Sequence, residues 1–270
     1  MTHAAHSNVE ILDLDAEVLA EHTAAITAWL PVRSAPRRIV DLGAGTGTGT
    51  FALLARFPDA RAIAVDTSTE HLDRLRDKAR AAGLTDRVRT IEADLDADWP
   101  DLGSPDLIWA SAAMHHLADP DRALRQIRDA LAPDGLFAVV ELAGFPRFLP
   151  DDAPAERPGL EARCHAARDH SRAGQLPHLG ADWGAKLSAA GFTLAGERTI
   201  TVHIKHSDVA TVGHYAVTSL RRMRAALADA LPVEDLAALD RLLDTDGPDS
   251  ILRRDDLAVR TERTVWAAWR

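Results

Sequence analysis

Short apolar runs alternate with amphipathic segments between residues 38 and 142. The runs are rich in branched and small apolar residues, a pattern typical of strands that are buried on both faces of a sheet. We expect strands at 38–42, 62–66, 88–91, 107–111 and 136–142. Helical segments separate most of these runs, so the strands are expected to pair in parallel, with helices on both faces of the sheet.

Capping residues indicate where several helices begin. Thr67, followed three residues later by a glutamate, predicts a capping box for the helix after the second strand. Asp119 and Pro120 predict an N-cap and a first-turn proline before a later helix. At the start of the chain, we expect a frayed end over residues 1–8 and a helix over 13–30.

The pattern becomes less regular after residue 142. The stretch 143–180 is rich in proline and too long for a simple connector, and segments of this kind often serve as lids. A helix is expected at 182–190, and strands at 194–204 and 259–269. Between those two strands lies an insert, about 207–253, whose first helix carries an apolar stripe. We therefore expect one domain, residues 1–270, with added elements.

Composition and charge narrow the class of protein. The chain of 270 residues has a net charge of −10, which disfavours nucleic acid as a partner. No apolar run is long enough to cross a membrane, and the polar first residues do not resemble a secretion signal. The single cysteine, Cys164, fits a reducing compartment. These features predict a cytoplasmic protein with a small-molecule substrate and no membrane or nucleic-acid partner.

A glycine-rich turn follows the first predicted strand. Gly43, Gly45 and Gly47 alternate with other residues, and Asp41 precedes them. Glycines allow a ligand to approach the backbone, and the helix that follows offers free N–H groups. The dinucleotide fingerprint G-x-G-x-x-G/A fails here in either register, because its last position falls on a threonine. A P-loop is excluded as well, because no lysine lies nearby.

Further motifs follow in order along the chain. Asp66 ends the second strand, where an acid can accept hydrogen bonds from both hydroxyls of a ribose. Asp94 closes the triplet Glu-Ala-Asp after the third strand. The stretch 105–111 leads into Met-His-His-Leu, and 131–136 (LAPDGL) forms the turn before the fifth strand. Together with the glycine turn, these motifs resemble class I S-adenosylmethionine-dependent methyltransferases, in particular the ubiquinone/menaquinone-biosynthesis-like group (types 11, 12 and 25).

The resemblance implies an α/β fold: a Rossmann-like, doubly wound, mostly parallel seven-stranded sheet with a helical cap. The antiparallel strand would be 259–269. The cofactor-binding core would cover about 33–142, and 9–31, 143–180 and 207–253 would cap the acceptor site. The implied cofactor is S-adenosylmethionine, with S-adenosylhomocysteine as the product. The implied cofactor-binding residues are Asp41, Gly43, Ala44, Gly45, Gly47, Asp66, Thr67, Asp94, Leu95 and Ser111.

The catalytic candidates come from the same edge of the predicted sheet. Methyl transfer is an in-line displacement in which positioning supplies much of the acceleration, and a hydroxyl acceptor must also lose a proton. His115 and His116 are candidates for a base or a substrate contact, although both fit a structural role in the loop. Glu141 is a candidate for orienting the substrate or for pairing with an arginine. The histidines show no spacing typical of a metal site, so we expect no metal.

We therefore expect methyl transfer to a small molecule, a metabolite or natural product, with oxygen or nitrogen as the acceptor atom. Two alternatives stay open. One is a transferase that uses the same cofactor and scaffold without moving a methyl group, and the other is a binding protein without catalysis. The acceptor cannot be read from the sequence. The apolar stripe of the insert suits either a lid or a homodimer contact.

Overall fold

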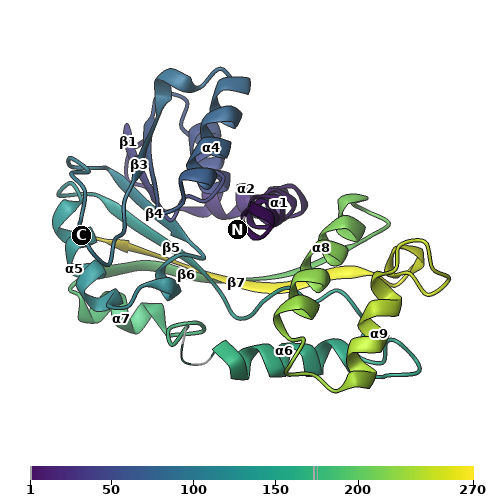
Figure 1. Ribbon diagram of the computed structural model, residues 1–270. Helices are drawn as coiled ribbons and strands as arrows, with labels where there is room; N and C mark the ends of the chain where they lie inside the picture. Colours follow the sequence, from purple (N-terminus) through teal and green to yellow (C-terminus); the bar gives the residue numbers. More distant parts are fainter. Residues whose placement is uncertain (1, 173, 175) are drawn as a thin grey trace.

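A computed structural model describes residues 2–172, 174 and 176–270 (Figure 1). Its centre is a seven-stranded sheet of order β3-β2-β1-β4-β5-β7-β6. β7 runs in the direction opposite to the other six strands, which confirms the expected fold. The strands are β1 Arg38–Leu42, β2 Arg61–Asp66, β3 Val88–Glu92, β4 Leu107–Ser111, β5 Leu136–Leu142, β6 Thr193–Lys205 and β7 Ala258–Trp269.

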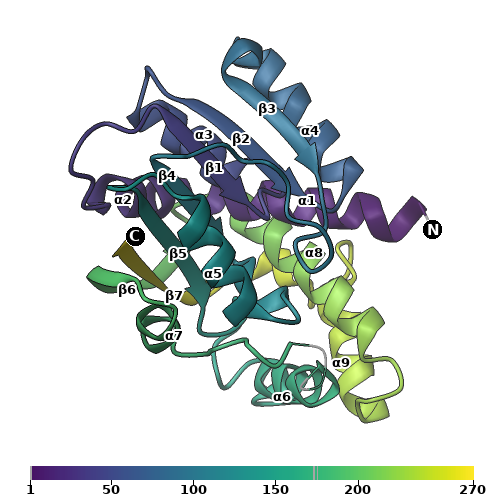
Figure 2. The same cartoon turned by 90° about the vertical axis from the view of Figure 1, so that its left-hand side faces the viewer.

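Helices cover both faces of the sheet (Figure 2). Ile26 of α2 (Ala20–Trp29) and Leu53 of α3 (Thr48–Arg56) pack on one face, on which α4 (Thr69–Ala81) also lies. Leu124 of α5 (Pro120–Ala130) and Trp183 of α7 (Trp183–Ala189) pack on the other face. The short apolar strands are buried between these layers, as expected for parallel strands.

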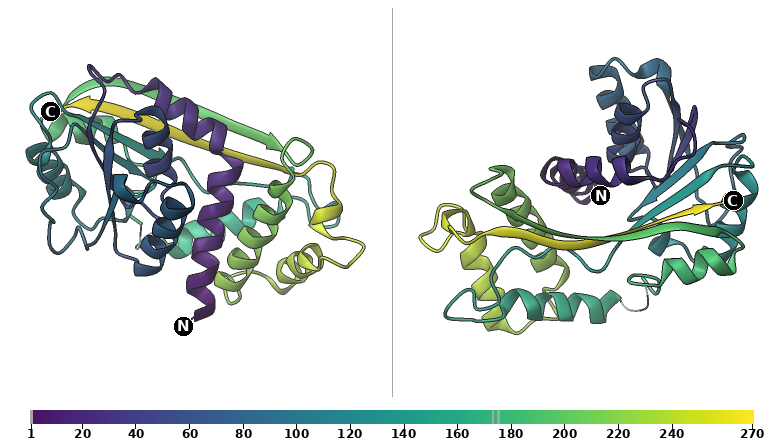
Figure 3. Two further views of the ribbon diagram at one scale, coloured as in Figure 1. Left: turned by 90° about the horizontal axis from the view of Figure 1, so that it is seen from above. Right: turned by 180° about the vertical axis from the view of Figure 1, so that it is seen from behind.

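The last two strands extend beyond the rest of the sheet. β5 pairs with β7 only up to Leu142 and Arg263, whereas β6 and β7 pair on to Lys205 and Ala258. This two-stranded ribbon passes the carboxyl ends of the parallel strands (Figure 3). A second core forms on it, with side chains from α6 (Leu160–Arg172), α8 (Thr211–Ala226) and α9 (Val233–Leu243). We call α6, α8, α9 and the outer ribbon the cap.

The apolar stripe of the insert is buried in this second core. Val212, Ala216 and Leu220 of α8 contact apolar residues of the ribbon, of α6 and of α9. Polar side chains elsewhere on α8 have partners within the chain. Tyr215 donates to Asp15, and Arg222 contacts the side chain of Asn8.

Three expectations about local structure need correction. The frayed end expected over residues 1–8 is wrong from Thr2 onward, because α1 spans Thr2–Val18 and contacts α4 and α8, which are distant in sequence. Residue 1 lies outside the described residues. The helix expected over 13–30 is divided at Leu19 between α1 and α2. The N-cap of α4 is Ser68 rather than Thr67, because the Ser68 side chain accepts the N–H of His71.

The stretch 143–180 contains a helix, α6, that the sequence pattern did not predict. In the part of the chain that the structure describes, no helix is both long enough and apolar enough to span a membrane.

Candidate functional site

The glycine turn connects β1 to α3 at the carboxyl edge of the sheet. Gly43, Gly45 and Gly47 have φ angles of 67°, 53° and 93°, a region that disfavours other residues. A Cβ at Gly43 would lie 2.4 Å from Cβ of Ala113, so only glycine allows the turn to pack against the loop after β4. A Cβ at Gly45 would meet only Leu12 of α1, at 3.3 Å. Gly43 is exposed and Gly45 is partly exposed, so the backbone of the turn is accessible at these two glycines.

Asp41 lies beneath the turn. Its carboxylate is buried and accepts a hydrogen bond of 2.6 Å from the hydroxyl of Thr50, in the first turn of α3. Burial raises the pKa of Asp41 to about 7. The side chain thus joins β1 to α3 and lies behind the exposed surface of the turn.

Asp66 joins the glycine turn to the end of β2. Its carboxylate accepts N–H bonds from Gly45 (2.8 Å) and Ser68 (2.9 Å), and His71 Nδ1 lies 3.2 Å from it. Burial raises the pKa of Asp66, but the hydrogen bonds from His71, Ser68 and Gly45 outweigh burial, so the pKa lies below its ordinary value. The carboxylate is therefore a fixed anion beside the turn, at the place where a ribose acceptor was expected.

The neighbouring strand ends carry the other residues that were predicted to bind the cofactor. Thr67 follows Asp66 and is exposed, and Ser111 ends β4. Asp94 is exposed, and its side chain accepts the N–H of Asp96 at 2.9 Å. Leu95 is partly buried beside the core on the α5 face. The carboxyl ends of four adjacent parallel strands thus bring these residues to one edge.

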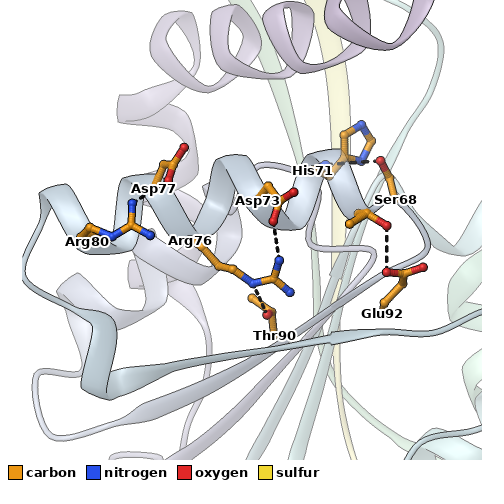
Figure 4. Close-up of polar contacts among 9 residues, drawn as sticks. Ser68, His71, Asp73, Arg76, Asp77, Arg80, Thr90 and Glu92 are labelled. Atoms are coloured by element: carbon orange, nitrogen blue, oxygen red, sulfur yellow. Dashed lines mark hydrogen bonds and ion pairs between the residues drawn. The ribbon is translucent and has the colours of Figure 1, made fainter. Parts of the chain in front are cut away.

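The first turn of α4 connects the ends of β2 and β3 (Figure 4). Ser68 caps this turn, and Glu92 at the end of β3 accepts a hydrogen bond of 2.8 Å from the hydroxyl of Thr69. Two turns later, Arg76 donates to Thr90 of β3 at 2.8 Å. These bonds fix the start of α4 over the two strands whose ends carry Asp66 and Asp94.

The loop after β4 is held by a buried acid. Glu141 of β5 accepts the N–H groups of Met114 (2.9 Å) and His115 (3.3 Å), and His115 Nδ1 lies 2.5 Å away. His115 is 2% exposed, so this pair is buried. When Nδ1–H donates to Glu141, Nε2 carries the free lone pair. The side chain that is hydrogen-bonded to Glu141 is thus His115, and Arg263 of β7 also interacts with the charge of Glu141.

His116 differs from its neighbour in exposure. It lies at the surface, with its ring centroid 4.2 Å from that of His115. Ala112, shortly before it, has a φ of 51°, which is unfavourable for a residue with a side chain. The bonds to Glu141 hold the loop in this conformation.

Helix α1, part of which was expected to cap the acceptor site, covers the glycine turn. Asp13 accepts a hydrogen bond from Arg74 of α4 at 2.8 Å and forms an ion pair with Lys78. Lys78 also donates to Thr46 in the turn, at 3.1 Å. An open groove of about 400 Å³ runs between α1 and α4, and Glu17 and Arg74 are among the residues that line it.

The same helix contacts the cap. Asp15 accepts hydrogen bonds from Tyr215 of α8 and Arg263 of β7, both at 2.8 Å. Burial raises the pKa of the Tyr215 hydroxyl well above its ordinary value, so Tyr215 remains a donor to this carboxylate. Within the described residues, no group of three or more acidic, histidine or cysteine side chains is placed to hold a metal.

Comparison with known proteins agrees with this geometry. The model of a methyltransferase domain matches residues 40–137. Trans-aconitate 2-methyltransferase of Acidovorax sp. (strain JS42) is 32% identical over 191 residues, which cover 70% of this chain and 67% of that protein. The enzyme of the same name from Paracidovorax citrulli (strain AAC00-1) is 30% identical over 223 residues, 80% of each chain.

Solved structures share the fold at lower identity. The YcgJ protein of Bacillus subtilis has a TM-score of 0.55 at 19% identity, over 93% of this chain and 98% of its own. Phosphoethanolamine N-methyltransferase 2 of Haemonchus contortus was solved with phosphomonomethylethanolamine and S-adenosylhomocysteine. It has a TM-score of 0.51 at 14% identity, over 93% of this chain and 52% of its own.

The residues at the carboxyl edge fit the cofactor of these enzymes. The turn exposes backbone at Gly43, and the fixed carboxylate of Asp66 accepts the N–H of Gly45 in the same turn. The matched domain contains both features. The chain therefore belongs to the class I S-adenosylmethionine-dependent methyltransferases, and S-adenosylmethionine is its cofactor.

Proposed function

We propose that this methyltransferase acts on a small molecule and transfers the methyl group to an oxygen or a nitrogen atom. The observation that carries the proposal is the cap on the β6–β7 ribbon, which extends past the carboxyl ends of the parallel strands (Figure 3). A site covered in this way favours a small acceptor and excludes water from the reaction. The net charge of −10 also disfavours nucleic acid as the acceptor.

The relatives indicate which acceptors to test first. Two of them are named for trans-aconitate, a small carboxylic acid. Carboxylic acids therefore come before phenols and amines in a search for the acceptor of this chain.

We assign the cofactor contacts as the resemblance implied them. Gly43, Ala44, Gly45 and Gly47 would hold the amino-acid part of the cofactor, and Asp66 with Thr67 its ribose. Asp94 and Leu95 would contact the adenine, and Ser111 would line the site between the strands. We assign Asp41 to holding the turn, because its carboxylate is already bonded to Thr50. When bound, the cofactor supplies an electrophilic methyl group on a sulfonium.

The histidines act according to the acceptor. A hydroxyl acceptor must lose its proton, and His115 would take it at Nε2 while Glu141 holds Nδ1. A carboxylate is already ionised at neutral pH and needs no base. His115 and Glu141 would then position the loop after β4, and His116, which is exposed, would contact the acceptor or solvent.

The test uses purified protein and S-adenosylmethionine labelled in its methyl group. A panel of di- and tricarboxylic acids, phenols and amines would be incubated with it, and the products analysed by mass spectrometry. The proposal predicts a labelled methyl ester, ether or amine of one small molecule. Labelling of only protein or RNA added as an alternative acceptor would contradict it.

A further inference from the structure

The loop after β4, residues 112–118, touches both segments that we assign to the cofactor. Near its start, Ala113 lies against the glycine turn, where a Cβ at Gly43 would be 2.4 Å from Cβ of Ala113. At its end, the backbone N–H of Ala118 donates to both carboxylate oxygens of Asp96, at 3.0 Å each. Asp96 belongs to the segment after β3, to which the adenine contacts are assigned. The loop that carries the two histidines is thus attached to the cofactor site at both of its ends.

The segment after β3, residues 93–98, is a short turn built around Asp94. The Asp94 carboxylate accepts the N–H of Asp96 at 2.9 Å. Its backbone carbonyl accepts the N–H groups of Ala97 and Asp98, both at 3.0 Å. The side chain that we assign to the adenine therefore also sets the backbone from which Asp96 projects. A ligand that holds Asp94 holds this turn as well.

Arg122 of α5 joins the same two elements in the opposite direction. Its Nη2 atom donates to the backbone carbonyls of Leu95, at 3.4 Å, and of Asp96. Its own N–H donates to Asp119, which caps α5 directly after the loop. A carboxylate from the turn thus holds the loop, and a guanidinium from the helix that follows the loop holds the turn. The two elements are therefore expected to move together.

The contact lies at the surface, whereas the start of the loop is held inside the protein. Ala118 is exposed and Asp96 is partly exposed, so water competes for this hydrogen bond. By contrast, Glu141, which accepts the N–H of Met114, is buried. Exposed backbone hydrogen bonds open more readily than those of the core. The end of the loop is therefore the part whose position depends on whether the turn after β3 is ordered.

We propose that Asp96 is a positioning residue that couples the cofactor site to the loop after β4. A bound cofactor holds Asp94, the turn after β3 becomes ordered, and Asp96 then fixes Ala118. A ligand shifts an equilibrium in this way when it binds one of two conformations more tightly. The exposed His116 lies two residues before Ala118, so it is held in one position after the cofactor has bound. The acceptor then meets a completed site. The proposal rests on the assignment of Asp94 under the proposed function.

The experiment measures amide hydrogen exchange by mass spectrometry, with and without S-adenosylhomocysteine. In the unchanged protein, the ligand should slow exchange at the end of the loop about tenfold or more, because a bond to a charged acceptor is then made more of the time. In Asp96→Ala this slowing should fall below about twofold, while the slowing in the glycine turn persists. Asp98→Ala is the matched control and should behave as the unchanged protein. Asp98 is an exposed acid of the same turn that enters it through its backbone N–H.

Calorimetric titration of S-adenosylhomocysteine separates the proposal from the assignment on which it rests. Asp94→Ala should weaken binding about 10- to 100-fold, because a hydrogen bond to a charged group is lost. Asp96→Ala should change the affinity less than about threefold. If thermal unfolding shows that Asp96→Ala does not fold, Asp96→Asn decides the question. It keeps one acceptor oxygen without the charge, so its slowing should lie between those of Asp96→Ala and the unchanged protein.

The outcomes are distinct. Slowing of exchange in the loop that persists in full in Asp96→Ala, or in Asp96→Asn where that variant decides, overturns the proposal. Absence of any slowing in the loop of the unchanged protein overturns it as well. An unchanged affinity in Asp94→Ala, together with loss of the slowing in Asp96→Ala, refutes the adenine contact of Asp94 and supports the role of Asp96.

Discussion

Asp66 is the residue on which the two halves of the cofactor site converge. Its carboxylate fixes the backbone at Gly45 and at Ser68, and it lies where the ribose is expected. One side chain thus shapes the turn and is available to the ligand. Its substitution should therefore affect binding more than fold.

We predict that Asp66→Ala weakens binding of S-adenosylmethionine at least tenfold, because a hydrogen bond to a charged group contributes about 1.5–3 kcal/mol. Isothermal titration calorimetry measures the change. His71→Ala is the matched control, since it removes one neighbour of the carboxylate but leaves the carboxylate in place. Equal affinities in Asp66→Ala and the unchanged protein would refute the assignment.

Asp41 is a buried acid whose protonation changes stability. Its ordinary pKa is 3.8, and burial raises it to about 7 in the folded protein. The folded state therefore binds this proton more tightly than the unfolded chain does. The free energy of unfolding loses the contribution of this group as pH rises from about 4 to about 7, and is level beyond that range.

Asp41→Asn should abolish this loss, because the amide keeps an acceptor for Thr50 and carries no charge. We predict that the variant gains stability relative to the unchanged protein between about pH 5 and about pH 7.5. Urea unfolding at both values measures the gain. Asp59→Asn, at an exposed position, should show no such gain. A constant difference between Asp41→Asn and the unchanged protein at both pH values would contradict the prediction.

The pattern of apolar runs along the sequence was enough to predict where several of the site residues lie. Asp66 and Glu141 lie at strand ends, and the carboxyl ends of parallel strands share one edge, so strand positions alone place them there. The partner of Glu141 was not predictable, because His115 follows a different strand and only folding brings the two together.

At the scale of elements, α1 connects the cofactor half to the cap. Asp13 binds Arg74 and Lys78 on one side, and Asp15 binds Tyr215 and Arg263 on the other. The ion pairs of Asp13 with α4 are partly exposed, so each is weak by itself. On the cap side, Leu14 and Val18 of α1 are buried in the apolar core, so the contact of α1 with α4 is the one that can open to let the cofactor pass.

We predict that Asp13→Asn speeds dissociation of S-adenosylhomocysteine about 2- to 10-fold, because two ion pairs to α4 are weakened. Stopped-flow displacement measures the rate. Asp73→Asn is the control, since Asp73 pairs with Arg76 within α4 and this ion pair does not involve α1. The effect should shrink at high salt, which screens both ion pairs. An unchanged rate at low salt would show that α1 does not retain the cofactor.

The elements differ in how far the sequence predicts them. β1, β4 and β5 begin and end where the apolar runs do, because their burial between helices requires an unbroken run. α1 begins earlier than its pattern indicates, because α4 and α8 supply the contacts that hold it. α6 is amphipathic but lies in a proline-rich stretch, and the residues that bury it come from the insert.

At the scale of the whole molecule, a single acid holds the cap together. Asp235 of α9 is fully buried and accepts hydrogen bonds from Arg157 and from Arg163 of α6, at 2.8 and 2.9 Å. These bonds join α9 to the first turn of α6 and to the segment just before it. The position of α6 therefore depends on its contact with α9.

We predict that Asp235→Asn destabilises the protein by roughly 2–4 kcal/mol, because both arginines lose their counter-charge at a buried position. Thermal unfolding measures the loss. Turnover should fall more than cofactor affinity, since the cofactor residues lie outside the cap. Asp240→Asn, which breaks a more exposed pair with Arg224 on the same helix, should change little. Equal losses of turnover and of cofactor affinity would contradict this separation.

The place of β7 in the sheet has a consequence for how the chain folds. β7 is the last of the seven strands in sequence, yet it lies between β5 and β6. Until it is in place, β6 has no neighbour in the sheet, and the ribbon that carries the cap cannot form. During synthesis on a ribosome, the first five strands can pair while the helices of the cap wait for a partner. Formation of the cap is thus a late, long-range step, and such steps are slow.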